Sequence, residues 1–174
     1  MAYRPPRVKG FSYRGYYRYF ITACTQGRLH WFADARRAHD LTAQLSPFFA
    51  TYGFEVLAYC VMPDHVHLLL EGLTADANLR EAMRQWKQKT ARECMTRYRA
   101  RLWQAGFHER VLREGDDIRA VVGYVLQNPV RAGLVRSARD WPWIGSSRYS
   151  IGDLGAHAGE WAPEWKRRIG VRRT

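Results

Sequence analysis

Residues Met62–Leu70 read Met-Pro-Asp-His-Val-His-Leu-Leu-Leu, a Pro-Asp turn signal followed by a β-forming run. Successive side chains of a strand point to opposite faces of a sheet, so His65 and His67 share one face. The other face receives the apolar side chains of Val66, Leu68 and Leu70. An isolated His-x-His pair is more often a half-exposed part of a strand than a metal site. Two imidazoles on one face can nevertheless bind a single metal ion.

Strand and helix patterns alternate regularly on both sides of this stretch. We expect strands at 16–25, 54–62, 65–70 and 107–112, with the second and third forming a hairpin across Pro63-Asp64. Helical spacing predicts helices at 33–52 and 78–99, and a third that begins after Gly115-Asp116-Asp117 and ends at Asn128, before Pro129. The order βαββαβ followed by a helix predicts an α+β fold. This fold is a ferredoxin-like or RRM-like antiparallel sheet with helices on one face and an additional helix.

The 174-residue chain suits one compact domain. We expect a basic N-terminal arm at 1–15, the domain at 16–150 and a basic C-terminal tail at 151–174. Three widely spaced cysteines without a Cys-x-x-Cys pair indicate reduced thiols. No apolar run approaches the roughly 18 residues of a membrane helix, and the start lacks the apolar stretch of a secretory signal. A cytoplasmic protein is therefore expected.

Charge gives the clearest global indication of a partner. The chain has 28 basic and 16 acidic residues and a net charge of +12. Only four of the basic residues are lysines, and the planar guanidinium of arginine suits phosphate and base recognition. An arginine-rich chain can also reflect GC-rich coding, but coding bias does not explain the net charge. A polyanionic partner is therefore expected.

A second motif lies about sixty residues after the histidines. Residues 123–135 read Gly-Tyr-Val-Leu-Gln-Asn-Pro-Val-Arg-Ala-Gly-Leu-Val. On a helix, Tyr124 lies beside an apolar stripe and Asn128 lies one turn further on nearly the same side, whereas Gln127 lies away from it. The stripe consists of Ile118, Val121, Val122 and Val125. If this helix packs on the histidine-bearing sheet, Tyr124 and Asn128 can both approach the histidines.

Together the two motifs resemble the single-tyrosine HUH transposases, and within them the REP-associated tyrosine transposases, which are relatives of the IS200-type enzymes. The resemblance extends from about Tyr19 to Tyr149. It implies metal-dependent cleavage and transfer of single-stranded DNA at hairpin (REP-like) sequences, with Tyr124 as the nucleophile and a 5′-phosphotyrosine intermediate. It also implies a divalent ion, Mg²⁺ or Mn²⁺, bound by His65, His67 and the residue four after the tyrosine. That residue is Asn128 here, where some relatives have glutamine, and His108 and Glu109 are alternative third ligands.

The DNA contacts are predicted from the basic arm, the second helix and the second motif. The candidate residues are Arg4, Arg7, Lys9, Arg80, Arg84, Lys87 and Arg131. Binding to DNA would place the protein at the nucleoid, as a monomer or a homodimer.

Two other functions compete with this interpretation. A non-catalytic RRM-like nucleic-acid-binding module shares the fold and the basic, aromatic character, but would have no use for the histidines and Tyr124 together. A metal-dependent phosphodiesterase would activate water with the histidine pair and would not need Tyr124. A domesticated transposase that binds its sites without moving is a third possibility.

Overall fold

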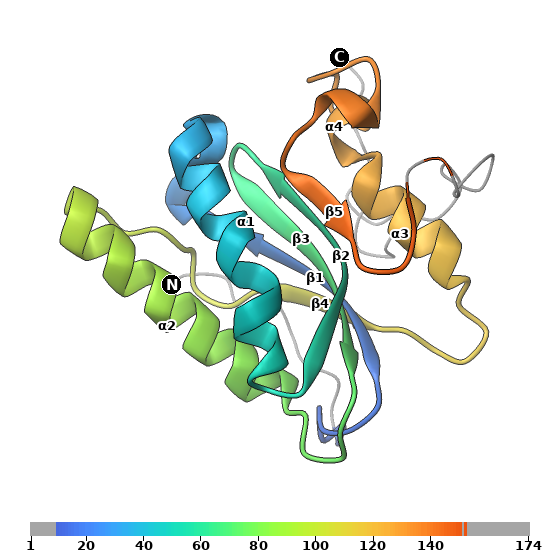
Figure 1. The fold of residues 1–174 in the computed structure, drawn as a ribbon. Coiled ribbons are helices and arrows are strands. Elements are labelled where there is room, and N and C mark those ends of the chain that lie inside the picture. Colours follow the sequence, from blue (N-terminus) through green and yellow to red (C-terminus); the bar gives the residue numbers. More distant parts are fainter. Residues whose placement is uncertain (1–9, 151, 153–174) are drawn as a thin grey trace.

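The computed structural model describes residues 10–150 and 152 as a central antiparallel sheet with helices on both faces (Figure 1). The strands are β1 (Arg18–Cys24), β2 (Phe54–Met62), β3 (His65–Gly72), β4 (His108–Val111) and β5 (Ile144–Ser146). Their order across the sheet is β4-β1-β3-β2-β5. The first four strands therefore have the ferredoxin-like arrangement predicted from the sequence.

The helices are α1 (Ala35–Ala50), α2 (Leu79–Tyr98), α3 (Ile118–Leu126) and the single-turn α4 (Asn128–Arg131). Short 3₁₀ turns occupy Gln26–Arg28 (η1), Trp31–Ala33 (η2) and Ala138–Asp140 (η3). Side chains cap the three longer helices: Asp34, Asn78 and Asp117 each accept a hydrogen bond from a backbone N–H of the first turn. None of the helices in the described part of the chain has the length and apolar character needed to cross a membrane.

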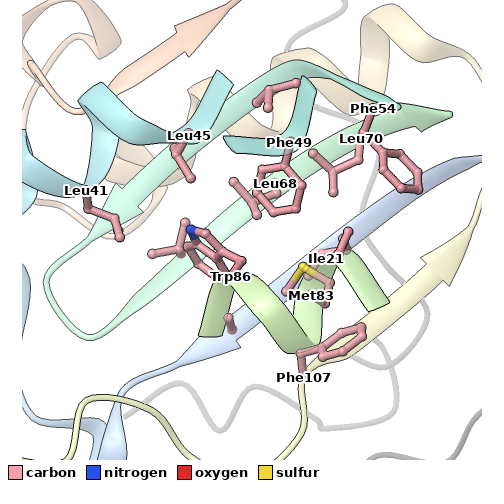
Figure 2. Packing of buried hydrophobic residues seen from close by; sticks show 14 of the residues in the cluster. Ile21, Leu41, Leu45, Phe49, Phe54, Leu68, Leu70, Met83, Trp86 and Phe107 are labelled. Carbon is pink, nitrogen blue, oxygen red and sulfur yellow. The ribbon is translucent and has the colours of Figure 1, made fainter. Parts of the chain in front are cut away.

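Helices α1 and α2 cover one face of the sheet and enclose the larger core (Figure 2). Leu45 and Phe49 of α1 and Trp86 of α2 pack toward Leu68 and the other apolar side chains of the central strands. Val66 and Leu70 belong to the same buried cluster, as the alternation along this strand predicted. One face of β3 is therefore committed to the core.

Helix α3 lies on the opposite face of the sheet (Figure 1). A second buried cluster joins Val121, Val122 and Val125 of α3 to Phe20 and Leu69 of the sheet. Because Leu69 follows His65 and His67 at intervals of two residues, this is the face that carries the histidines. The additional helix thus packs on the histidine-bearing side.

Three local features differ from the prediction. Residues 10–15 pack on the domain, since Tyr13 is buried and Gly15 donates to the Ala77 carbonyl. The predicted boundary after Gly15 therefore lies inside the folded part. Helix α3 ends two residues early, at Leu126, and the chain turns into α4 across Pro129. Strand β5 pairs with β2 and was not expected.

Residues 1–9, 151 and 153–174, with Arg4, Arg7, Lys9 and nearly all of the predicted tail, lie outside the described residues.

Candidate active site

The two histidines lie side by side at the start of β3, directly after the turn that joins it to β2. In the sheet, His65 is paired with Cys24 and His67 with Thr22, both from β1. His67 has no exposed surface, and the His65 side chain is 12% exposed. Two ionisable rings at such depth need polar partners, because burial without hydrogen bonds is costly.

Each ring is held by an oxygen atom at Nδ1. The His65 Nδ1 lies 2.6 Å from Oδ1 of Asp64, and the His67 Nδ1 lies 2.9 Å from Oγ1 of Thr22. Burial favours a higher pKa for Asp64, but the hydrogen bond with His65 and the charge of Arg28 outweigh it and hold the pKa below its ordinary value. Asp64 is therefore a carboxylate, which can only accept hydrogen bonds. It fixes the proton of His65 on Nδ1 and leaves a lone pair on Nε2.

The two Nε2 atoms face each other at a distance of 3.0 Å. In metal-free protein this spacing suits a hydrogen bond in which one ring donates to the other. It also fits two neighbouring ligands of one ion, since ligand bonds of about 2.1 Å at right angles place the nitrogens about 3.0 Å apart. Metal-binding histidines usually carry a hydrogen-bonded oxygen on the other ring nitrogen, as both do here. The donor set therefore fits a divalent ion.

Tyr124 lies over the same part of the sheet. Its ring centroid is 6.2 Å from that of His67, and Phe20 contacts both rings, at 5.3 Å from His67 and 5.6 Å from Tyr124. Tyr124 is 1% exposed, and burial raises the pKa of its phenol to about 12. The guanidinium carbon of Arg131 lies 5.2 Å from the ring centroid and partly offsets the rise in pKa.

Asn128 is held one helical turn after Tyr124. Its side-chain nitrogen donates to the Tyr124 carbonyl oxygen at 2.7 Å, and the residue is 5% exposed. With the nitrogen used in this way, the amide oxygen is the atom that a metal could take. Gln127 is only half-buried and is the C-cap residue that follows α3.

The sequence of this chain also matches a family of known proteins. The family described as IS200-like transposases matches residues 14–128, which include both histidines, Tyr124 and Asn128. The chain is an IS200-like transposase.

Individual relatives agree with this assignment. A Haemophilus influenzae protein assigned to the REP-associated tyrosine transposases is 29% identical over 141 residues, which cover 72% of this chain and 77% of the relative. The REP-associated tyrosine transposase of Escherichia coli is 31% identical over 90 residues, 52% of this chain and 53% of its own. A solved structure of a REP-associated tyrosine transposase bound to a REP hairpin shares the fold. It has a TM-score of 0.69 at 22% identity and covers 91% of this chain and 96% of the other.

The two residues predicted as alternative third ligands are separated by the pleat of β4. His108 is paired with Thr22 and so lies on the histidine-bearing face. Glu109 is paired with Ile21 and accepts a hydrogen bond from the Tyr13 hydroxyl on the core face. Only His108 of the two is therefore on the same side as the histidine pair.

The basic residues predicted on α2 lie on the other side of the sheet from the histidines, because α2 covers the core face (Figure 1). Arg80 and Arg84 are exposed, and Arg84 pairs with Glu81 at 2.6 Å. The Lys87 ammonium donates to the carbonyl oxygens of Gln104 and Gly106. DNA could contact these residues only if it extended past the histidine-bearing face. Arg131, by contrast, lies over the ring of Tyr124.

Sequence reasoning missed Thr22 and the role of Asp64 as ring partners. Asp64 precedes His65 in the Met62–Leu70 motif, where the Pro-Asp pair indicates only a turn. Thr22 is separated from His67 by 45 positions, and nothing local indicates that their strands pair in this register.

Proposed function

We propose that this transposase cuts single-stranded DNA beside a hairpin and rejoins it through a covalent bond between Tyr124 and a 5′-phosphate. The observation that carries the proposal is the convergence of the His65 and His67 Nε2 atoms beneath the helix that presents Tyr124. Hairpin DNA is the proposed partner because a REP-associated relative with the same fold was solved with a REP hairpin. Acting on such DNA would place the protein at the nucleoid.

The proposed step exchanges one phosphate ester for another. The Tyr124 oxygen loses its proton and forms a bond to phosphorus, the bond from phosphorus to the 3′-oxygen breaks, and that oxygen takes up a proton. Because the phosphotyrosine keeps an ester bond, the reverse reaction can join a new 3′-hydroxyl without ATP. The phenol is neutral near pH 7, since its pKa is about 12, so its proton must be removed as it attacks.

The metal would be held by the two histidines and by the amide oxygen of Asn128. A divalent ion, Mg²⁺ or Mn²⁺, offsets charge on the phosphate oxygens and orients the phosphate when it is bound. Asp64 and Thr22 orient the rings, and Phe20 sets the spacing between His67 and Tyr124. The Arg131 cation favours the ionised phenol.

The test is formation of a covalent protein–DNA species. A labelled hairpin oligonucleotide with a single-stranded flank, incubated with wild type and Mg²⁺ or Mn²⁺, should give a product that survives denaturing electrophoresis. Mass spectrometry should place the nucleotide on Tyr124. Tyr124→Phe should fold and bind metal and DNA, yet neither cut nor become attached. Tyr98→Phe, an exposed tyrosine on α2, should behave as wild type.

Two results would favour the competing functions. Cleavage by Tyr124→Phe near the wild-type rate, with a free 5′-phosphate, would indicate a phosphodiesterase that activates water. Binding to RNA as tight as to hairpin DNA, without cleavage of either, would indicate an RRM-like binding module.

A further inference from the structure

The loop after β1 is fastened to the turn that precedes His65. The backbone N–H of Thr25 donates to the Asp64 carbonyl oxygen at 3.0 Å. The Thr25 hydroxyl lies 2.9 Å from the same oxygen and 2.7 Å from that of Leu29, and can donate to either. Thr25 is 1% exposed. The backbone of Asp64 is thus held independently of its side chain.

Arg28, in this loop, contacts the Asp64 side chain. Its Nε lies 2.9 Å from Oδ2 of Asp64, and its Nη1 lies 3.0 Å from Sγ of Cys24. The other carboxylate oxygen, Oδ1, is the partner of the His65 Nδ1 at 2.6 Å. The two oxygens of Asp64 are therefore divided between a guanidinium and a metal-site imidazole.

The backbone of the loop has an unusual conformation at Arg28. Gly27 and Arg28 have φ of 63° and 57°, in the left-handed region that side chains with a Cβ avoid. A strained arginine that is tied to a site residue suggests a function there rather than a random surface conformation. Its side chain is 49% exposed, and an ion pair so open contributes little to folding stability.

We propose that Arg28 is a positioning residue of the metal site. It holds the Asp64 carboxylate in the orientation that keeps the proton of His65 on Nδ1 and the Nε2 lone pair directed at the metal. The role rests on the function proposed above, because it presumes that His65 binds an ion.

The direction in which metal affinity changes when Arg28 is replaced distinguishes a positioning role from a purely electrostatic one. A nearby cation repels a divalent ion, so loss of the Arg28 charge alone would tighten metal binding. Loss of positioning would weaken it. The two explanations of the same ion pair therefore predict opposite changes in metal affinity.

Arg28→Asn is the informative substitution, because asparagine tolerates the left-handed conformation better than other residues with a Cβ. Arg99→Asn is a matched control. Arg99 also has a left-handed φ, of 55°, is exposed, and ends α2 on the opposite side of the sheet. The two variants lose the same charge and side chain from the same backbone conformation.

Mn²⁺ affinity is measured by calorimetry or electron paramagnetic resonance on protein without DNA. Arg28→Asn should weaken it about threefold to tenfold, less than the roughly 10- to 100-fold typical when a direct partner of a ligand histidine is lost. Arg28→Lys should recover part of the loss, and Arg99→Asn should show none. In metal-free protein, ¹⁵N NMR should find the proton of His65 on Nδ1 in wild type and shared between the ring nitrogens in Arg28→Asn.

A double-mutant cycle locates the effect. In an Asp64→Asn background, Arg28→Asn should not weaken Mn²⁺ binding further, because the carboxylate through which it acts is gone. Unchanged or tighter binding by Arg28→Asn, or an equal loss in both backgrounds, would overturn the proposal. If wild type bound no Mn²⁺, the proposed metal site would be refuted, and the role of Arg28 with it. Cleavage that depends on Tyr124 is measured separately and would show whether the proposed function also fails.

Discussion

Replacing Thr22 by valine tests whether the hydrogen bond to His67 supports the metal site. The Thr22 Oγ1 lies 2.9 Å from the His67 Nδ1, and the two residues are 7% and 0% exposed. Valine keeps the branched shape and exchanges only the hydroxyl for a methyl group. The change therefore removes one partner of a buried hydrogen bond without opening a cavity.

Two magnitudes follow from this geometry. Loss of one partner of a buried hydrogen bond costs about 1–3 kcal/mol. For a chain of this size the melting temperature should fall by about 2–12 °C. Because a hydrogen-bonded oxygen holds the orientation of a ligand histidine, metal affinity should fall about 10- to 100-fold.

The assay combines thermal unfolding without metal and Mn²⁺ titration without DNA. Thr22→Ser keeps the hydroxyl and should stay close to wild type in Mn²⁺ affinity. Thr90→Val is the control for stability alone, since the buried Thr90 hydroxyl binds the Trp86 carbonyl and the Trp103 indole on the far side of the sheet. It should lower the melting temperature and leave Mn²⁺ affinity unchanged. If Thr22→Val lost stability but kept wild-type Mn²⁺ affinity, the hydrogen bond would be structural and our reasoning about the ring would be refuted.

Other predictions concern the tyrosine, the third ligand and the fold. Asn128→Ala should weaken Mn²⁺ binding more than Gln127→Ala, measured by the same titration, and the reverse order would place the wrong amide on the metal. Arg131→Gln should raise the pKa of Tyr124 further above its ordinary value, since the cation favours the phenolate. At a fixed pH and saturating DNA, single-turnover cleavage should then be slower than with Arg136→Gln, an exposed control, and equal rates would exclude this role. Gly72→Ala should destabilise the fold in urea unfolding by more than about 2 kcal/mol, because the new Cβ would lie 2.0 Å from the Gly15 carbonyl oxygen. Hairpin affinity should fall steeply with salt as bound basic residues release counterions, and a flat salt series would contradict phosphate contacts.

Local patterns were sufficient to predict much of the site. The two-residue period of a strand placed His65 and His67 on one face and Val66 in the core, and the structure confirms both. The helical period brought Asn128 next to Tyr124, where its side chain bonds the Tyr124 carbonyl oxygen. These inferences depend only on the geometry of one element, which the sequence determines directly.

Contacts between elements needed the tertiary structure. The period of β4 predicts that His108 and Glu109 face opposite ways, but only strand pairing decides that His108 shares the face of the histidine pair. Thr22 became the partner of His67 through the register of two strands distant in sequence.

By itself the sequence determined the order of elements, the faces of each strand and helix, and the two motifs that identify the family. The tertiary structure decided that α3 packs on the histidine-bearing face, that Asp64 and Thr22 hold the rings, and that Arg28 reaches Asp64. The physical reason is the distance along the chain over which each interaction acts. Periodicity and capping act within a few residues, whereas register and packing are set by burial of both faces of the sheet at once.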